Sequence, residues 1–340
     1  MLTLVTGGSG FIGSHLVEAL LARGERVRVL DVRAPHALPP GVEFMEGSVT
    51  DRDAVAKAVK DARFVFHTAA MAHIWARDKR LYQDVNRLGT RIVLDACRKA
   101  HIERVVHTSS LTVLVGKQSN KSSVTVNEHT VLDEGDMLGP YCVSKLQAEA
   151  EVTRAVAQGL SVVTTIPTLP IGPGDYGLTA PTKMILDLVS GRIPAYLECI
   201  LNLIDVRDLA LGHILARDKG RNGERYILGH ENMSLSKLLS VIHDITGLDM
   251  PKHQVPYPLA RAAATINELI SDYITRRPPK APVTGVRLAG RLVWFDSSKA
   301  VKELGLAQRP IITSVEDEIR WLAQEGLAEL PKPMQSHTEI

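Results

Sequence analysis

Residues 2–13 read LTLVTGGSGFIG and decide the fold of this 340-residue chain. The strand-forming run Leu2–Thr6 leads directly into a glycine-rich turn, and an amphipathic helical pattern follows. Such a turn must bend tightly, expose backbone amides at the start of a helix and let the helix pack on the strand, and a Cβ would obstruct each of these. The GxxGxxG spacing between a strand and a helix therefore predicts a pyrophosphate cradle. The residues expected to form it are Gly7, Gly10, Phe11, Ile12 and Gly13.

Beyond this motif, short apolar runs alternate with longer helical segments as far as about residue 167. Parallel strands need such crossovers to return over the sheet, so the pattern predicts an α/β fold with a doubly wound parallel sheet of the Rossmann type. The expected strands are Leu2–Thr6, Arg26–Asp31, Phe64–Thr68, Arg104–Ser109 and Ser161–Ile166. The expected helices are Gly13–Arg23, Asp51–Lys60, Gln83–Lys99 and Pro140–Gln158.

The second half of the chain is mixed in pattern and richer in proline and glycine just after Pro167. We expect a dinucleotide-binding domain over residues 1–169, a smaller, mixed substrate-binding region over 170–330 and a loose tail over 331–340. Strands at 201–206 and 224–228 are expected to return to the main sheet. Ser314–Asp317 fits a capping box that would begin a helix over Val315–Gln324.

Composition limits the classes of partner. Forty Lys and Arg against 38 Asp and Glu leave a net charge of +2, which favours a small-molecule ligand over nucleic acid. The three cysteines are far apart and form no CxxC or Cys/His cluster, so we expect neither disulfides nor a metal site. The start of the chain does not resemble a signal peptide, and no apolar stretch is long enough to span a membrane. The predicted location is the cytoplasm.

The second expected strand ends in Asp31, 18 residues after Gly13. A carboxylate at this spacing accepts hydrogen bonds from the adenosine ribose, which favours NAD as the cofactor. Arg33 lies two residues further on and would suit a 2′-phosphate, which leaves NADP as an alternative. A solvated loop arginine is an equally good interpretation of Arg33.

A second motif, Tyr141-Cys-Val-Ser-Lys145, opens the helix predicted over Pro140–Gln158. Side chains at i and i+4 share a helical face, so the ammonium is expected to lower the phenol pKa and make Tyr141 a general acid or base. The strand before this helix ends in Thr108–Ser110, at the sheet edge where open α/β folds bind ligands. A hydroxyl there is placed to hold a substrate carbonyl or alcohol.

Together these motifs resemble the extended short-chain dehydrogenase/reductases, the NAD-dependent epimerase/dehydratase family. The resemblance covers nearly the whole chain. It implies that Tyr141 is the proton donor or acceptor, that Lys145 orients the nicotinamide ribose, and that Ser110 fixes the substrate oxygen, with Ser109 and Thr112 as neighbours able to substitute. It also implies a homodimer. Further cofactor contacts implied by the resemblance are Ser48, Val49, Ala69, Ala70, Asn86, Tyr141, Lys145 and Pro167.

Within that family, the chain is most similar to the hopanoid-associated sugar-epimerase-like group, the dihydroflavonol reductases and the 3β-hydroxysteroid and sterol 4-carboxylate dehydrogenases. The stretches that carry this likeness include Trp75–Asp78, Pro170–Pro173, Asn202–Asp208 and Trp294–Lys299. Two departures matter. Ser48 stands where relatives often have an Asp that holds the adenine amine. Ile166 stands where sugar-nucleotide epimerases often have an Asn, which weakens a nucleotide-sugar substrate.

The substrate region is rich in aliphatic residues between Leu169 and Ile204 and has one arginine, Arg192. An apolar pocket fits this composition, and ordinary core packing of a lid helix is the alternative. We therefore expect an NAD(P)-dependent oxidoreductase that interconverts a secondary alcohol and a ketone on an apolar cyclic substrate such as a sterol or hopanoid. The alternatives are a nucleotide-sugar epimerase or dehydratase with transient hydride transfer, and a non-catalytic dinucleotide sensor.

Residues 256–274 predict an amphipathic helix with apolar residues at helical spacing, and no acidic residue lies between Ile274 and Trp294. Two interpretations are open. The helix either packs its apolar face into the core beside a solvated basic loop, or rests on an anionic membrane surface at the inner face of the membrane.

Overall fold

The computed structural model describes residues 1–36, 39–119 and 124–329. Its centre is a seven-stranded sheet in the order β3-β2-β1-β4-β5-β7-β11, and every pairing in it is parallel. This order confirms the predicted doubly wound α/β fold. The strands are β1 Leu2–Thr6, β2 Arg26–Asp31, β3 Val42–Glu46, β4 Phe64–His67, β5 Arg104–Thr108, β7 Val162–Pro167 and β11 Arg225–Leu228.

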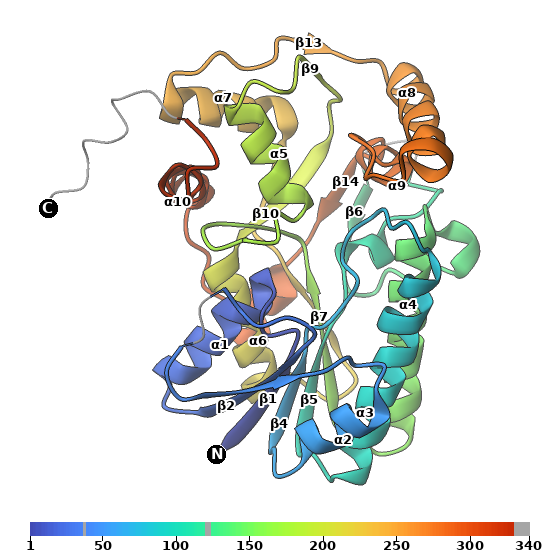
Figure 1. The fold of residues 1–340 in the computed structure, drawn as a ribbon, viewed down its shortest axis with the longest axis vertical. Coiled ribbons are helices and arrows are strands. Elements are labelled where there is room, and N and C mark those ends of the chain that lie inside the picture. The colour runs from blue at the N-terminus through green and yellow to red at the C-terminus, as the bar shows by residue number, and fades with distance from the viewer. Residues whose placement is uncertain (37–38, 120–123, 330–340) are drawn as a thin grey trace, which may run out of the picture.

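Helices cover both faces of this sheet (Figure 1). On one face α1 (Phe11–Ala22) packs against α6 (Val206–Lys219) over a core that includes Val5 and Ile214. The other face carries α2 Arg52–Val59, α3 Thr90–Lys99 and α4 Pro140–Ala157. The helix predicted over Gln83–Lys99 has two parts, because a π-helical segment, Tyr82–Gly89, precedes α3.

The smaller part of the molecule is built on a three-stranded sheet in the order β12-β10-β8. Its strands are β8 Leu169–Ile171, β10 Ile200–Asp205 and β12 Glu231–Ser234, and the helices packed against it are α5 Ala180–Val189, α7 Leu235–Thr246 and α10 Ile311–Gln324. The aliphatic side chains expected to line an apolar pocket are instead the core of this part. Those buried there include Ile185, Leu186, Leu188, Val189, Leu201 and Leu203.

The remaining elements are two short strand pairs and two further helices. They are the strand pairs β6 Val124–Val126 with β14 Val293–Phe295 and β9 Ala195–Tyr196 with β13 His253–Gln254, and the helices α8 Tyr257–Ile270 and α9 Val283–Ala289. The short helical segments are 3₁₀ turns at Leu111–Leu114 and Glu134–Asp136 and π-helical turns at Ser271–Thr275 and Ala300–Leu304. No helix among the described residues is both long and apolar enough to cross a bilayer.

Two predictions about the strands and helix starts are also wrong. The strand at 201–206 does not return to the main sheet, because β10 pairs with β8 and β12, whereas β11 does join the main sheet beside β7. Ser314–Asp317 does not cap a helix. Helix α10 begins at Ile311, which is 1% exposed and anchors the first turn in the core, so Ser314 lies buried inside the helix. The predicted tail, 331–340, lies outside the described residues.

Candidate active site

The glycine turn lies at the carboxyl end of β1 and is held by close backbone packing. Gly7 has φ +74°, and a Cβ there would approach the Cα of Ala69 at 2.6 Å. A Cβ on Gly13 would lie 2.1 Å from the Gly7 carbonyl oxygen, so α1 sits directly on the turn. The turn is closed by hydrogen bonds from the Gly7 amide to the Leu30 oxygen (2.9 Å) and from the Gly10 amide to the Gly7 oxygen (3.1 Å).

This packing leaves a cradle that fits a dinucleotide. Gly10 precedes the first turn of α1 and offers no side-chain cap, so the amides of Phe11 and Ile12 have no partner within the helix. Unpaired amides at a helix N-terminus, with the positive end of its dipole, favour a phosphate. The predicted cradle residues Gly7, Gly10, Phe11, Ile12 and Gly13 are therefore all brought to one place.

Asp31 and Ser48 lie beside the cradle, at the ends of β2 and β3. The Asp31 carboxylate accepts the Ser9 amide at 3.0 Å, which places its charge against the glycine turn. Arg33 is exposed, and its backbone oxygen accepts the Ser9 hydroxyl at 2.8 Å. The Gly47 amide donates to the backbone oxygen of Asp31 at 2.9 Å, which brings Ser48 to the same edge of the sheet. Val49 is buried, and a Cβ on Gly89 would lie 2.7 Å from its Cγ2 atom.

The segment after β4 packs against the glycine turn. Ala69 packs on Gly7, and Ala70 and Met71 follow it. The Asn86 side chain is 1% exposed, accepts the Met71 amide at 2.7 Å and donates to Ser144 at 2.9 Å. Because the protein itself uses both ends of this amide, Asn86 holds the Met71 segment to α4.

The three predicted catalytic residues come from the end of β5 and the first turns of α4. Tyr141 is 7% exposed, and its ring packs edge-on against Tyr82 with 6.1 Å between centroids. Burial raises the pKa of Tyr141 to about 12, and Ser110 opposes this rise. The expectation that Lys145 lowers the pKa of this phenol is therefore wrong for the protein without cofactor, because burial is the larger effect. Ser110 also accepts the Thr112 hydroxyl at 3.1 Å. Ser110 and Tyr141 are thus placed to share one oxygen of a substrate.

Lys145 lies one helical turn after Tyr141 on α4 and is buried. Its ammonium donates to the Thr108 backbone oxygen at 2.7 Å, and the Thr108 hydroxyl is in turn hydrogen-bonded to His213 Nε2 at 3.0 Å. Burial lowers the pKa of Lys145 to about 8, and the charge of Glu149 opposes that change. The Thr108 backbone oxygen accepts a hydrogen bond from one of the three ammonium hydrogens, so the others can donate to ribose hydroxyls.

Sequence reasoning missed the supporting residues. Ser109, considered as a substitute for Ser110, instead donates its hydroxyl to Glu149, which lies one turn after Lys145 on α4. Arg225 of β11 pairs with Glu149 at 3.4 Å. His213 comes from α6, more than a hundred residues from Thr108. These partners are distant in sequence, so no local motif predicts them. Glu149 is the exception, because it lies four residues after Lys145 and so shares its face of the helix.

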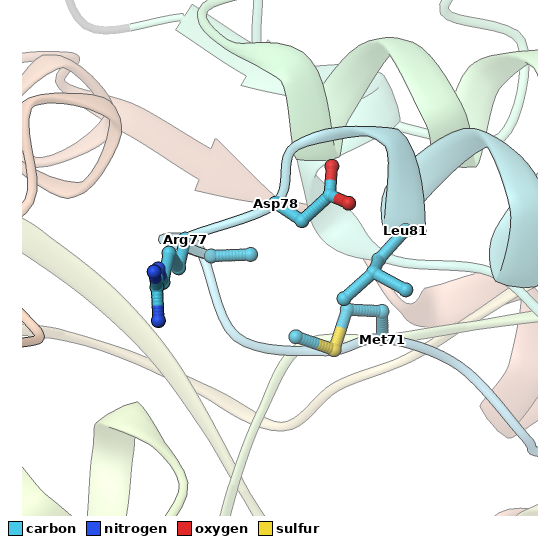
Figure 2. A pocket seen from close by; sticks show the side chains of 5 residues that line it. Met71, Arg77, Asp78 and Leu81 are labelled. Atoms are coloured by element: carbon cyan, nitrogen blue, oxygen red, sulfur yellow. The ribbon is translucent and has the colours of Figure 1, made fainter. Parts of the chain in front are cut away.

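Pro167 ends β7 at the same sheet edge and is buried. An open hollow of about 660 Å³ lies along the segment that follows β4, and its lining residues are Met71, Ala76, Arg77, Asp78 and Leu81. Met71 packs against the apolar cluster that holds Ala76 and Tyr141. Figure 2 shows Met71 and Leu81 side by side, with Arg77 across the hollow.

The fold and this site define a dinucleotide-dependent oxidoreductase. The chain belongs to the NAD dependent epimerase/dehydratase family, whose model matches residues 3–229. It is therefore an NAD-dependent enzyme, and the cradle described above suits that cofactor.

Relatives match the chain along nearly its full length. One from Synechocystis sp. that carries a dihydroflavonol 4-reductase name is 37% identical, over 95% of this chain and 94% of its own. Sterol demethylase protein B of Methylococcus capsulatus is 32% identical, over 96% of this chain and 100% of its own. The crystal structure of gox2253 superposes with a TM-score of 0.82 at 34% identity, covering 96% of this chain and 99% of its own.

Proposed function

We propose that this enzyme interconverts a secondary alcohol and a ketone on an apolar, cyclic substrate of the sterol or hopanoid type. The observation that carries the proposal is the buried group at the carboxyl end of β5, where Ser110 follows Thr108, Lys145 donates to the Thr108 oxygen, and Tyr141 lies one helical turn before Lys145 on α4. Two hydroxyls that converge on one point suit a single carbonyl or alcohol oxygen.

Each residue has a distinct task. NAD, when bound, accepts or supplies the hydride. In the reducing direction Tyr141 gives its phenol proton to the carbonyl oxygen as negative charge develops there, and Ser110 donates a hydrogen bond to the same oxygen. The raised pKa of Tyr141, about 12, keeps the phenol protonated and ready to donate at neutral pH. Lys145 donates to the Thr108 oxygen and keeps further ammonium hydrogens for the ribose of the cofactor.

The nature of the cavity supports an apolar substrate. Met71, Ala76 and Leu81 contribute apolar surface to the hollow, and Ala76 and Met71 also belong to or pack against the apolar cluster that holds Tyr141. The relative named sterol demethylase protein B also favours this class, since it aligns along its whole length. A nucleotide sugar needs several cationic or amide side chains around its diphosphate, and Arg77 is the one lysine or arginine that lines this hollow within the described residues.

The proposal is tested by following reduced-nicotinamide absorbance with a panel of 3-hydroxy and 3-keto sterols, hopanoids and nucleotide sugars. We expect one cofactor turned over per polycyclic substrate converted. Tyr141→Phe should lower kcat by about 10²–10⁴-fold, because it removes the acid that acts in the transition state. NAD affinity, measured by calorimetric titration, should stay within about threefold, since the phenol hydroxyl contributes only one contact.

Tyr82→Phe is the matched control. It also removes a phenol hydroxyl from the same aromatic cluster, but that hydroxyl donates to the His73 backbone oxygen at 2.7 Å rather than facing Ser110. It should retain most of the activity. Conversion of a nucleotide sugar without net change in NAD, or full activity in Tyr141→Phe, would overturn the proposal.

A further inference from the structure

Helix α8 and the π-helical turn that continues it, Ser271–Thr275, leave an apolar face uncovered. The large apolar side chains there recur at spacings of three, four or seven residues and so form one stripe along the helix. Their exposed fractions are Leu259 63%, Ile266 59%, Leu269 52%, Ile270 40%, Tyr273 79% and Ile274 74%. Within α8 Ala264 is the buried residue. The expectation that this helix packs its apolar face into the core is therefore wrong, and the stripe faces away from the protein.

The acidic residues of this segment are turned inward. Asp272 accepts the Trp75 indole at 2.9 Å and the Lys79 ammonium at 2.8 Å. Glu268 accepts the Val283 amide at 2.7 Å. These contacts fasten the inner side of α8 to the body of the protein, so the outward stripe carries no negative charge. The orientation of α8 is thus set by its polar side, which leaves its apolar side outward.

Positive charge accumulates around the stripe. Arg276, Arg277 and Lys280 follow it directly and are exposed. Arg261 of α8 is also exposed. Burial lowers the pKa of Arg291, and the positive charges of Arg261 and Arg287 lower it further. The Arg291 Nε atom is buried without a hydrogen-bond partner. The exposed arginines and the lysine form a positively charged border beside the stripe, which attracts an anionic surface.

We propose that the stripe of α8 docks on an anionic bilayer, with its apolar side chains among the lipid acyl chains and the surrounding arginines against phosphate headgroups. A large exposed apolar face bordered by arginine and lysine is the chemistry that binds such a surface. A second copy of the chain fits less well, because its own stripe carries no acidic side chain to pair with Arg276, Arg277 and Lys280. The docking does not depend on which substrate the enzyme uses.

Docking would also bring the membrane next to the active site. The side of α8 that faces the protein and the start of α4 line an open cavity of about 230 Å³, with Pro140, Thr265 and Thr284 among its lining residues. Leu269, at the border of the stripe, also lines this cavity. Pro140 directly precedes Tyr141. A lipid-dissolved molecule would then reach this region without crossing water. Figure 1 shows α8 at the outer edge of the molecule, at the end away from the N-terminus.

The test is sedimentation of the full-length protein with vesicles of phosphatidylcholine alone and of an equimolar mixture of phosphatidylcholine and phosphatidylglycerol. We expect binding to the anionic vesicles that weakens with added salt. The double variant Ile266→Gln/Ile274→Gln and the triple variant Arg261→Gln/Arg276→Gln/Arg277→Gln should each weaken binding by about tenfold or more. The first removes apolar side chains from the acyl-chain contact, and the second removes positive charges from the headgroup contact.

Matched controls are Ile312→Gln, which removes an apolar side chain that is 52% exposed on α10, and Arg98→Gln, at the exposed end of α3. Both should bind vesicles like the unaltered protein. Thermal unfolding checks that the variants fold. The proposal is overturned if the unaltered protein stays in the supernatant, or if the α8 variants bind as well as the controls. It is equally overturned if the α8 variants turn a dimer into a monomer without changing vesicle binding.

Discussion

Single residues in the glycine turn control cofactor binding through backbone contact. In Gly13→Ala the new Cβ would meet the Gly7 carbonyl oxygen at 2.1 Å, so the turn must shift. We expect NAD affinity to fall at least about tenfold and the free energy of unfolding to fall by about 1–3 kcal/mol. Calorimetric titration and urea unfolding measure the two effects.

Gly24→Ala is the control for this prediction. Gly24 also has a positive φ, +74°, but nothing lies within 4 Å of an added Cβ. This variant should lose about 1–2 kcal/mol of stability from backbone strain and bind NAD normally. An unaltered NAD affinity in Gly13→Ala would contradict the close-packed cradle.

Asp31 is expected to set the preference between NAD and NADP. Asp31→Asn keeps an acceptor for the Ser9 amide but removes the negative charge that repels a 2′-phosphate. NAD affinity should fall by about threefold to tenfold while NADP affinity rises. Titration of both cofactors into both proteins measures the ratio, and an unchanged ratio would show that Asp31 does not face the ribose.

At the scale of elements, one buried carboxyl on α10 is hydrogen-bonded to the segment that follows β8. Glu318 is fully buried and accepts the Gly172 amide at 2.8 Å. Burial raises its pKa from 4.5 to about 8, so the folded protein holds this proton while the unfolded chain releases it. The contribution of Glu318 to stability is therefore present at low pH and is lost as pH rises from about 4.5 to 8.

Glu318→Gln imitates the protonated form at every pH. We expect it to raise the free energy of unfolding by roughly 2–5 kcal/mol at about pH 8.5 and to leave it nearly unchanged below about pH 4.5. Urea unfolding of both proteins across this range gives the difference. A difference that grows toward low pH would show that the carboxyl is ionised in the folded state.

At the scale of the whole molecule, the Rossmann sheet is completed by residues from beyond position 169. Strand β11 pairs with β7, and α6 covers α1 and the apolar face of the sheet. A fragment of residues 1–169 would expose that face. We expect it to lack a cooperative thermal transition by circular dichroism, whereas residues 1–329 should unfold cooperatively. A fragment that melts cooperatively and binds NAD would contradict this expectation.

Local patterns account for the parts of the structure that sequence predicts well. The parallel strands and the glycine cradle follow from runs and spacings within about thirty residues, and so do Tyr141 and Lys145. The errors concern non-local choices. A buried strand pattern does not say which sheet it joins, so β10 was assigned to the wrong one. Periodicity likewise locates the stripe on α8 but not the side it faces, which the inward contacts of Glu268 and Asp272 decide.

The aliphatic residues between Leu169 and Ile204 show the same limit. Their composition suits a pocket or a core equally well, and the packing of α5, α7 and α10 around them makes them core. The supporting partners of Lys145, which are Thr108, His213 and Glu149, also depend on tertiary contacts between elements far apart in the chain.

The measurement that tests the central claim most directly is transfer of deuterium from NADH labelled at the nicotinamide C4. The enzyme is incubated with 3-keto sterols and hopanoids, and the products are analysed by mass spectrometry. We predict one deuterium in each alcohol formed, in step with cofactor oxidation, and loss of this product in Tyr141→Phe but not in Tyr82→Phe. Conversion of a nucleotide sugar with no net cofactor oxidation, and no labelled alcohol from any polycyclic ketone, would contradict the account.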